Sequence, residues 1–213
     1  MEKCLVIGAA GQIGTELVSA LRSKRGIDNV IAADLRVDNL SSPFYELDVT
    51  NESALLDLVV SEGVTEVYHL VAILSATGEK APKTAWELNM KTLLNVLDLA
   101  KEGIIQRVFW PSSIAVFGPS TPREKAPQYT VMDPNTVYGI SKSAGELWCQ
   151  YYFENYGVDV RSIRYPGLIS WKTMPGGGTT DYAIEIFHSA RKGIDFCSFL
   201  GPDTRLPMMY MDD

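Results

Sequence analysis

Short apolar runs alternate with helical patterns along most of the chain. The apolar runs predict six strands, at residues 4–8, 30–34, 44–49, 66–72, 107–113 and 158–166. Apolar residues at helical spacing, together with capping residues, predict helices at 12–25, 52–60, 86–102 and 135–156. Strands that alternate with helices are typical of βα units, which build parallel sheets. We therefore expect an α/β fold, a doubly wound parallel sheet with helices on both faces.

The pattern changes after residue 166. The segment "MPGGGTTD" at 174–181 predicts a glycine-rich loop that leads into a short helix, and the final "RLPMMYMDD" is apolar and β-like. We therefore divide the chain into a first domain at 1–166 and a second, partial region at 167–213. A natural domain seldom stops on such a segment, so we expect the sequence to end before its C-terminal part.

Composition narrows the function classes. The chain has 213 residues, 46% hydrophobic and 21% charged, with a formal net charge of -7. This balance argues against nucleic-acid binding and against a basic membrane patch, and no apolar run is long enough to span a bilayer. Cys4, Cys149 and Cys197 are scattered and odd in number, which favours reduced thiols of a cytoplasmic protein. Neither they nor His69 and His188 have zinc-ligand spacing, so we expect core or surface histidines and no metal site.

The stretch "GAAGQIG" at 8–14 follows the first predicted strand and opens the first helix. Its glycines, Gly8, Gly11 and Gly14, permit a tight turn, a close approach of a pyrophosphate and close packing of helix on strand. Amides at the helix N-terminus, around Gln12 and Ile13, can then receive the phosphate charge. This context predicts a dinucleotide site of the Rossmann type, and a purely structural turn is the alternative.

The acidic residues that follow favour NAD over NADP. Asp34 ends the second predicted strand, 20 residues past Gly14. A carboxylate there accepts hydrogen bonds from a ribose diol and repels a 2′-phosphate. Arg36 instead favours NADP, since its guanidinium can pair with a 2′-phosphate. Asp48 and Val49 end the third predicted strand, where an aspartate can meet the adenine amino group or simply form a turn before Thr50.

The stretch "YGISK" places Tyr138 and Lys142 four residues apart, on one face of a predicted helix. Alone this spacing is weak evidence of function, because it arises readily by chance. Downstream of a predicted dinucleotide site, it indicates a candidate acid/base pair. A free phenol has a pKa near ~10, too high for a base at neutral pH, and a nearby ammonium lowers it.

Several segments in one order resemble the short-chain dehydrogenase/reductase superfamily, in its extended, UDP-sugar-epimerase-like branch. They are the glycine pattern, Asp34, "DVTN" (48–51), "WELNM" with Asn89, "WPSSIAVFG" (110–118), "YGISK" and "RYPG" (164–167). The resemblance implies that Tyr138 is the general base and that Lys142 supplies the ammonium and holds the nicotinamide ribose. It places the hydroxyl that orients the substrate at Ser113. Strand alternation points the adjacent Ser112 to the opposite face.

The resemblance also implies further cofactor contacts from the fourth strand, the long helix and the sixth strand. These are Leu70, Ala72, Asn89, Tyr165 and Pro166.

Two loops bear on the substrate, "LSATGE" (74–79) and "PGGGTTDYA" (175–183). With the other motifs they are similar to the short-chain type of L-threonine 3-dehydrogenase, which is distinct from the zinc-dependent type. The resemblance implies NAD-dependent oxidation of the C3 hydroxyl of L-threonine to 2-amino-3-oxobutanoate, a step of amino-acid catabolism. We expect substrate contacts from Ser75, Thr179 and Asp181, with Thr77 and Thr180 as weaker candidates. The alternative for the second loop is an ordinary helix N-terminus with a favourable acid.

Other functions are also compatible with the sequence. The scaffold also suits a nucleotide-sugar epimerase or dehydratase, a dinucleotide-sensing regulator without catalysis, or a folded NAD-binding fragment without turnover. In relatives the two long helices pair with a second subunit, so the resemblance implies a homodimer with a four-helix interface. Burial of these helices within one subunit is the alternative.

Overall fold

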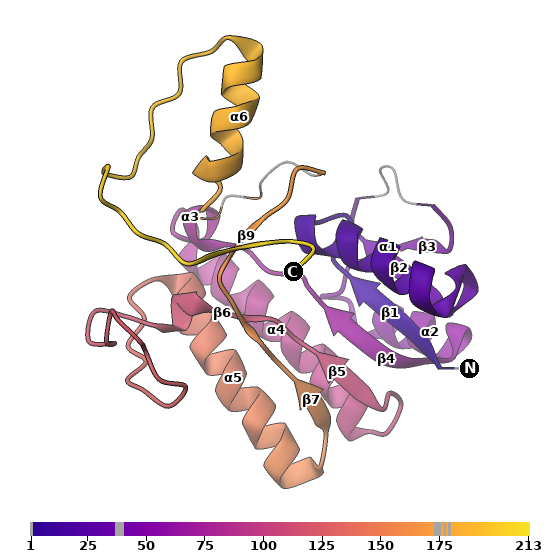
Figure 1. Cartoon of the computed structure of the whole chain (residues 1–213). Coiled ribbons are helices and arrows are strands. Elements are labelled where there is room, and N and C mark those ends of the chain that lie inside the picture. Colours follow the sequence, from indigo (N-terminus) through magenta and orange to yellow (C-terminus); the bar gives the residue numbers. More distant parts are fainter. Residues whose placement is uncertain (1, 37–40, 173–175, 177, 179) are drawn as a thin grey trace.

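A six-stranded parallel sheet forms the centre of the molecule (Figure 1). The computed structural model describes residues 2–36, 41–172, 176, 178 and 180–213. The strands are β1 (Lys3–Ile7), β2 (Val30–Asp34), β3 (Phe44–Glu46), β4 (Val64–His69), β5 (Arg107–Phe109) and β7 (Asp159–Arg161). Their order, β3-β2-β1-β4-β5-β7, reverses direction between β1 and β4. This is the predicted doubly wound sheet, and ligands of such sheets bind where the order reverses.

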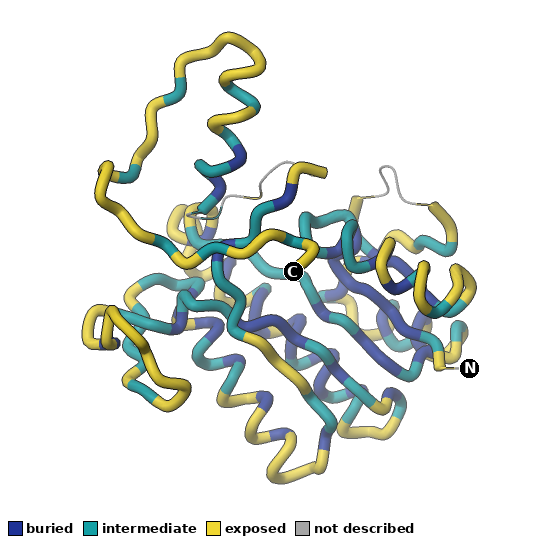
Figure 2. Tube along the Cα trace, in the orientation of Figure 1, coloured by how far each residue is buried: buried dark blue, intermediate teal, exposed yellow. Residues whose placement is uncertain are grey.

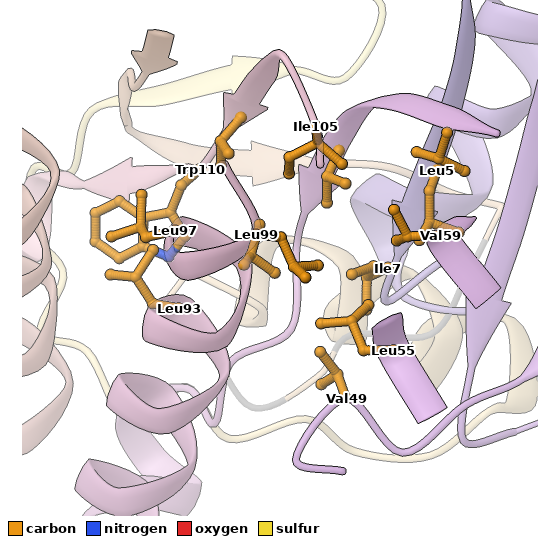
Figure 3. Packing of buried hydrophobic residues seen from close by; sticks show 14 of the residues in the cluster. Leu5, Ile7, Val49, Leu55, Val59, Leu93, Leu97, Leu99, Ile105 and Trp110 are labelled. Atoms are coloured by element: carbon orange, nitrogen blue, oxygen red, sulfur yellow. The ribbon is translucent and has the colours of Figure 1, made fainter. Parts of the chain in front are cut away.

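Helices cover both faces of the sheet. On one face α1 (Gln12–Arg25) packs on Cys4 and Val6. On the other, α2 (Glu52–Glu62), α4 (Pro82–Lys101) and α5 (Val137–Tyr156) enclose the larger core, which receives Leu5 and Ile7. Figure 3 shows this core between α4 and the sheet. Successive residues of β1 are buried on opposite sides because side chains alternate along a strand.

Two predicted strands are each broken in the structure. The fifth leaves the sheet after Phe109, and Pro111, which has no N–H to donate, precedes a second short strand, β6 (Ser112–Ser113). The sixth divides into β7 and β8 (Arg164–Tyr165). β6 and β8 pair with each other in parallel, outside the main sheet. The breaks therefore create a second, smaller platform at the carboxyl edge of the large sheet.

The helices agree with the sequence more closely than the strands do. The helix predicted at 86–102 begins earlier, with Pro82 in its first turn, a position that proline tolerates. α5 begins at Val137 because the side chain of Thr136 caps it by accepting from Gly139 N. Three short elements were not predicted, α3 (Ser75–Gly78) and the 3-10 turns Ile27–Asn29 and Ile114–Val116.

The C-terminal part of the chain continues from the small platform. β9 (Gly167–Ile169) pairs with β10 (Met208–Tyr210), which confirms a strand in the final apolar segment. α6 (Tyr182–Lys192) is the helix expected after the glycine-rich loop, and it projects away from the sheet. Figure 2 shows that this projecting part is largely exposed. Across the described residues, no helix combines the length and the apolarity needed to cross a membrane.

Gly145 allows α5 to cross closely over Trp110. A Cβ at this position would lie 2.3 Å from Cη2 of the buried Trp110 ring. We predict that Gly145→Ala lowers the free energy of unfolding by about 1–3 kcal/mol, because the buried indole must shift. Chemical denaturation measures the change. Gln150→Ala, an exposed position on the same helix, should stay within about 0.5 kcal/mol of the parent. Equal stability of the Gly145 variant and the parent would refute this account of the packing.

Candidate active site

The glycine turn after β1 forms a cradle that only small residues permit. Gly8 has a φ of +84°, and a Cβ there would lie 3.1 Å from Val71 N. A Cβ on Gly14 would lie 2.2 Å from the Gly8 carbonyl oxygen, so α1 packs tightly on the turn. α1 begins after Gly11, which has no side chain to occupy the first amides of the helix. The cradle therefore suits a phosphate group at the helix N-terminus.

Gln12 adds an independent observation. Its side chain lines the cavity beside the cradle, and its Nε2 is buried without a hydrogen-bond partner among the described residues. Buried donors normally find an acceptor, so this amide fits a ligand that brings acceptor oxygens into the cavity. The cradle and the amide together fit the pyrophosphate of a dinucleotide.

The residues predicted for the adenosine end border a second cavity of ≈ 200 Å³. Asp34 lies at its wall with Oδ2 accepting from Ala10 N at 3.0 Å and Oδ1 accepting from Arg36 N at 3.1 Å. Asp48 accepts from the hydroxyl and the N–H of Thr50, and these bonds lower the pKa of its carboxyl group. Asp48 thus forms the turn before Thr50, the alternative given for it above, and it lies at the edge of the cavity. The predicted residues at this wall are Gly8, Gly11, Asp34, Arg36, Asp48, Val49, Leu70 and Ala72.

A larger cavity of ≈ 280 Å³ brings the predicted catalytic residues together. Leu70 and Ala72 border both cavities, so the two adjoin just beyond the end of β4. The predicted residues around the larger cavity are Gln12, Ile13, Ser75, Ser113, Tyr138, Lys142, Tyr165, Pro166, Thr180 and Asp181.

Ser113 and Ser112 both border this cavity, but their hydroxyl groups have different partners. The interaction of the Ser113 hydroxyl with Tyr138 lowers the pKa of the phenol, which favours the phenolate. The Ser112 hydroxyl instead donates to Glu146 Oε1 at 2.5 Å. Ser112 is not turned away from the cavity as strand alternation predicts, since both serines border it. Burial raises the pKa of Tyr138, and the interaction with Ser113 offsets only part of this increase.

Lys142 is a buried cation. Its side chain is held by the Pro111 carbonyl oxygen, 2.5 Å from Nζ, and Nζ lies 4.3 Å from the centroid of the Trp110 ring. The Tyr138 ring centroid is 5.6 Å from the same atom. Burial lowers the pKa of Lys142 to about 7. Sequence reasoning did not find Trp110 and Pro111 as its partners, because the direction of a backbone carbonyl leaves no pattern in the sequence.

His69 is a core residue at the end of β4. Its Nε2 lies 3.0 Å from Thr92 Oγ1, and only 1% of the residue is exposed. Burial, and secondarily the charge of Lys142, lower the pKa of His69 to about 3. The imidazole is therefore neutral at physiological pH and adds no positive charge near the lysine. Within the described residues, no three His, Cys, Asp or Glu side chains gather so as to hold a metal ion.

Asn89 borders neither cavity, in contrast to the expected cofactor contact. It is buried, and its amide accepts from Ile73 N at 2.8 Å and donates to Ile73 O at 3.2 Å. A third bond joins it to Ser141 Oγ at 3.1 Å. Asn89 therefore ties the segment after β4 to α5, beside Tyr138 and Lys142. Its buried bonds position the cavity wall.

The predicted substrate residues are only partly assembled. Asp181 is 7% exposed, and its Oδ2 accepts from Gly178 N at 2.6 Å, so the carboxylate also shapes its own loop. Thr77 is exposed on α3 and does not border the cavity. Thr179 lies outside the described residues. Ser75 and Thr180 complete the polar wall on this side of the cavity.

Comparison with known proteins identifies the family. The model of the NAD dependent epimerase/dehydratase family matches residues 4–202. The chain belongs to this family. An uncharacterized epimerase/dehydratase of Staphylococcus saprophyticus is 50% identical to this family member over 100% of the chain and 68% of the relative. The chain thus spans about two thirds of that relative's length.

Solved structures relate this family member to dehydrogenases. A partial consensus L-threonine 3-dehydrogenase is 58% identical, with a TM-score of 0.95 over 99% of this chain and 68% of the other. The holo form of a GalE-like L-threonine dehydrogenase from Cupriavidus necator is 57% identical, with a TM-score of 0.94 over 99% and 69% of the two chains. The UDP-glucose 4-epimerase of Thermotoga maritima, at 21% identity and a TM-score of 0.86, shares the fold. The family and the holo neighbour support NAD(H) binding and an oxidoreductase.

Asp34 offers a test of the adenosine end in this family member. We predict that Asp34→Ala weakens NADH binding by about tenfold or more, because the ribose of NADH loses a charged hydrogen-bond acceptor. The preference for NADH over NADPH should also decrease, because the 2′-phosphate of NADPH is no longer repelled by a carboxylate. Fluorescence titration with each cofactor measures both effects. Asp57→Ala, an exposed acid on α2, serves as the control. An unchanged ratio of the two dissociation constants would exclude this role for Asp34.

Lys142 offers a test of the buried charge. Below the folded-state pKa of about 7 the folded protein buries an ammonium, while the unfolded chain keeps its lysine protonated up to about 10.4. Between these values the unfolded state binds more protons, so stability of the parent rises with pH. We predict that Lys142→Met is more stable than the parent by about 1–4 kcal/mol at pH 6, and that the gap shrinks towards pH 10.

Denaturation at a series of pH values measures this gap. Lys24→Met, at an exposed position on α1, should show no such pH dependence. A gap that stays constant from pH 6 to pH 10 would contradict the burial of a titrating amine.

Proposed function

We propose that the chain is an L-threonine 3-dehydrogenase of the short-chain type, which oxidises the C3 hydroxyl of L-threonine to 2-amino-3-oxobutanoate with NAD. The supporting observation is the convergence of Tyr138, Lys142 and Ser113 on one cavity beside the glycine cradle. The similarity to solved L-threonine dehydrogenases at 57% and 58% identity supports the substrate. The product can lose CO₂ to give aminoacetone, or be cleaved with coenzyme A to glycine and acetyl-CoA.

The chemistry requires two removals from one C–O unit. The hydroxyl oxygen loses a proton and C3 loses a hydride as the C–O single bond becomes a carbonyl. Bound NAD supplies the hydride acceptor. Tyr138 takes the proton, and Ser113, which borders the same cavity, holds the substrate oxygen next to the phenol.

Lys142 makes the phenol a usable base. Burial moves the pKa of Tyr138 up and the pKa of Lys142 down, so both groups tend toward their neutral forms. An ammonium near the ring favours the phenolate, and the Trp110 face and the Pro111 carbonyl oxygen help to keep that ammonium charged. The pair therefore works as a unit in which each charge supports the other.

The other polar side chains that border the catalytic cavity suit an amino acid. Ser75 and Thr180 offer hydroxyl groups for a carboxylate, and Asp181 offers an acceptor for an ammonium. We assign these three as the substrate contacts, with residues 1–166 as the NAD-binding domain and 167–213 as part of the substrate region.

We also propose a homodimer through α4 and α5. The outer side of α5 exposes large apolar residues, including Leu147 (62% exposed), Trp148 (40%) and Tyr151 (45%). Trp86 on α4 is 39% exposed. Such aromatic groups are enriched at protein interfaces. Two copies of the helix pair would bury them in a four-helix contact.

A nucleotide-sugar epimerase or dehydratase is the second candidate, favoured by the 50% identity to uncharacterized epimerase/dehydratases of Staphylococcus. Such an enzyme returns the hydride to its substrate. Net accumulation of NADH therefore separates the two functions.

We predict that the purified chain forms NADH from NAD and L-threonine, and that Tyr138→Phe lowers kcat by about 100-fold or more because the base is lost. Binding of NADH should change little, since the phenol hydroxyl is not needed to fill the cradle. Absorbance at the NADH band follows turnover, and fluorescence titration follows binding.

Tyr129→Phe is the matched control, because Tyr129 is 94% exposed and does not border the catalytic cavity. A UDP-sugar replaces L-threonine in a parallel reaction. No NADH from L-threonine, or full turnover by the Tyr138 variant, would refute the proposal.

A further inference from the structure

The face of α5 that carries Tyr138 and Lys142 continues to Glu146. These residues follow one another at intervals of four, so they lie along one side of the helix. The Glu146 side chain is 17% exposed and does not border the catalytic cavity. It lies one turn below the lysine.

Glu146 receives hydrogen bonds from both strands of the small platform. The Ser112 hydroxyl of β6 donates to Oε1 at 2.5 Å. Arg164 of β8 donates from Nε to Oε1 at 2.8 Å and from Nη2 to Oε2 at 2.7 Å. A two-bond contact between guanidinium and carboxylate fixes orientation as well as distance.

Glu146 remains a carboxylate in this setting. Burial raises its pKa, but the hydrogen bonds from Arg164 and Ser112 outweigh burial, so the pKa lies below its ordinary value. These two groups are the polar partners that face the carboxylate from β8 and β6.

The register of the platform links this contact to the chemistry. Ser112 pairs with Arg164, and Ser113 pairs with Tyr165. Ser112 and Arg164 bind Glu146, while Ser113 and Tyr165 border the catalytic cavity, as Ser112 also does. Because Ser112 and Arg164 directly precede Ser113 and Tyr165 on their strands, the bonds to Glu146 constrain the backbone that carries these cavity residues.

We infer that Glu146 is a positioning residue, which clamps the β6–β8 platform to α5 and thereby holds the Ser113 hydroxyl beside Tyr138. This inference rests on the proposed function for the role of Ser113 and Tyr138. The clamp joins the helix that carries the base to the strand that carries the orienting hydroxyl, through a carboxylate that does not itself border the catalytic cavity.

A purely structural role would give a different result. Arg164 also donates to the Gln128 carbonyl oxygen at 3.2 Å and to Met132 Sδ at 3.0 Å, and its guanidinium carbon lies 5.4 Å from the centroid of the Phe117 ring. Arg164 therefore also holds the segment before α5. Loss of that contact alone would lower stability and leave the position of Ser113 relative to Tyr138 unchanged.

Two variants separate these roles. Glu146→Gln keeps the shape of the side chain and removes its charge. Ser112→Ala removes the link to β6 and leaves the ion pair of Glu146 with Arg164 in place. Asp159→Asn is the matched control. Asp159 lies on β7, forms ion pairs with Arg107 and Arg161, and does not border the catalytic cavity.

The first readout needs no turnover. Crystal structures of the full chain and of both variants, without ligand, report the contact between Ser113 Oγ and Tyr138 Oη. We expect this hydrogen bond in the parent and in Asp159→Asn, and its loss in Glu146→Gln and Ser112→Ala. A retained bond in both variants would overturn the inference, whatever reaction the protein catalyses.

The second readout is a double-mutant cycle on threonine oxidation. We expect kcat to fall by about 10- to 100-fold in Glu146→Gln, with NADH affinity unchanged. In a Ser113→Ala background the same substitution should have little further effect, because both act through one hydroxyl. Independent, multiplying losses would overturn the inference. Absence of threonine oxidation in the parent would refute the proposed function, and the crystal structures would still decide on the clamp.

Discussion

The site depends on the burial of one ammonium. Lys142 is 4% exposed and has no carboxylate partner in the described structure; its neighbours are the Pro111 carbonyl oxygen and the rings of Trp110 and Tyr138. Isolated buried charges destabilise a fold unless something compensates for lost hydration. A fold selected for stability alone would place an apolar residue here. The arrangement makes sense when the ammonium has a second task, which is to favour the phenolate of Tyr138.

The need to stabilise this buried ammonium explains why the chain leaves the main sheet at the end of β5. β5 ends at Phe109, and Trp110 and Pro111 then present a ring and a carbonyl oxygen to α5. Gly145 lets the helix approach that ring. The strand break thus serves two purposes, since it supplies partners for the lysine and begins the platform that carries Ser113. Strong packing of α4 and α5 on the sheet supports this less regular edge.

The sequence predicts those features that depend on periodicity or on residue type at short range. The order of strands and helices and the glycine cradle follow from such local rules. Features that depend on long-range partners do not. The pairing of β6 with β8 joins residues about 50 positions apart, and the bonds of Asn89 reach Ile73 and Ser141. A polar residue in a long helix gives no sign of which neighbour it will meet.

The division between cofactor and substrate regions follows the same logic. Proton removal from a secondary alcohol makes the same demands whether the alcohol belongs to an amino acid or to a sugar. A tyrosine, a lysine and a serine therefore describe the reaction without choosing the substrate. Under the proposed function the choice falls to Ser75, Thr180 and Asp181, which come from a short helix and a loop outside the sheet. Substrate preference could then change through these outer segments while the sheet stays the same, and an epimerase at 21% identity does share the fold, with a TM-score of 0.86.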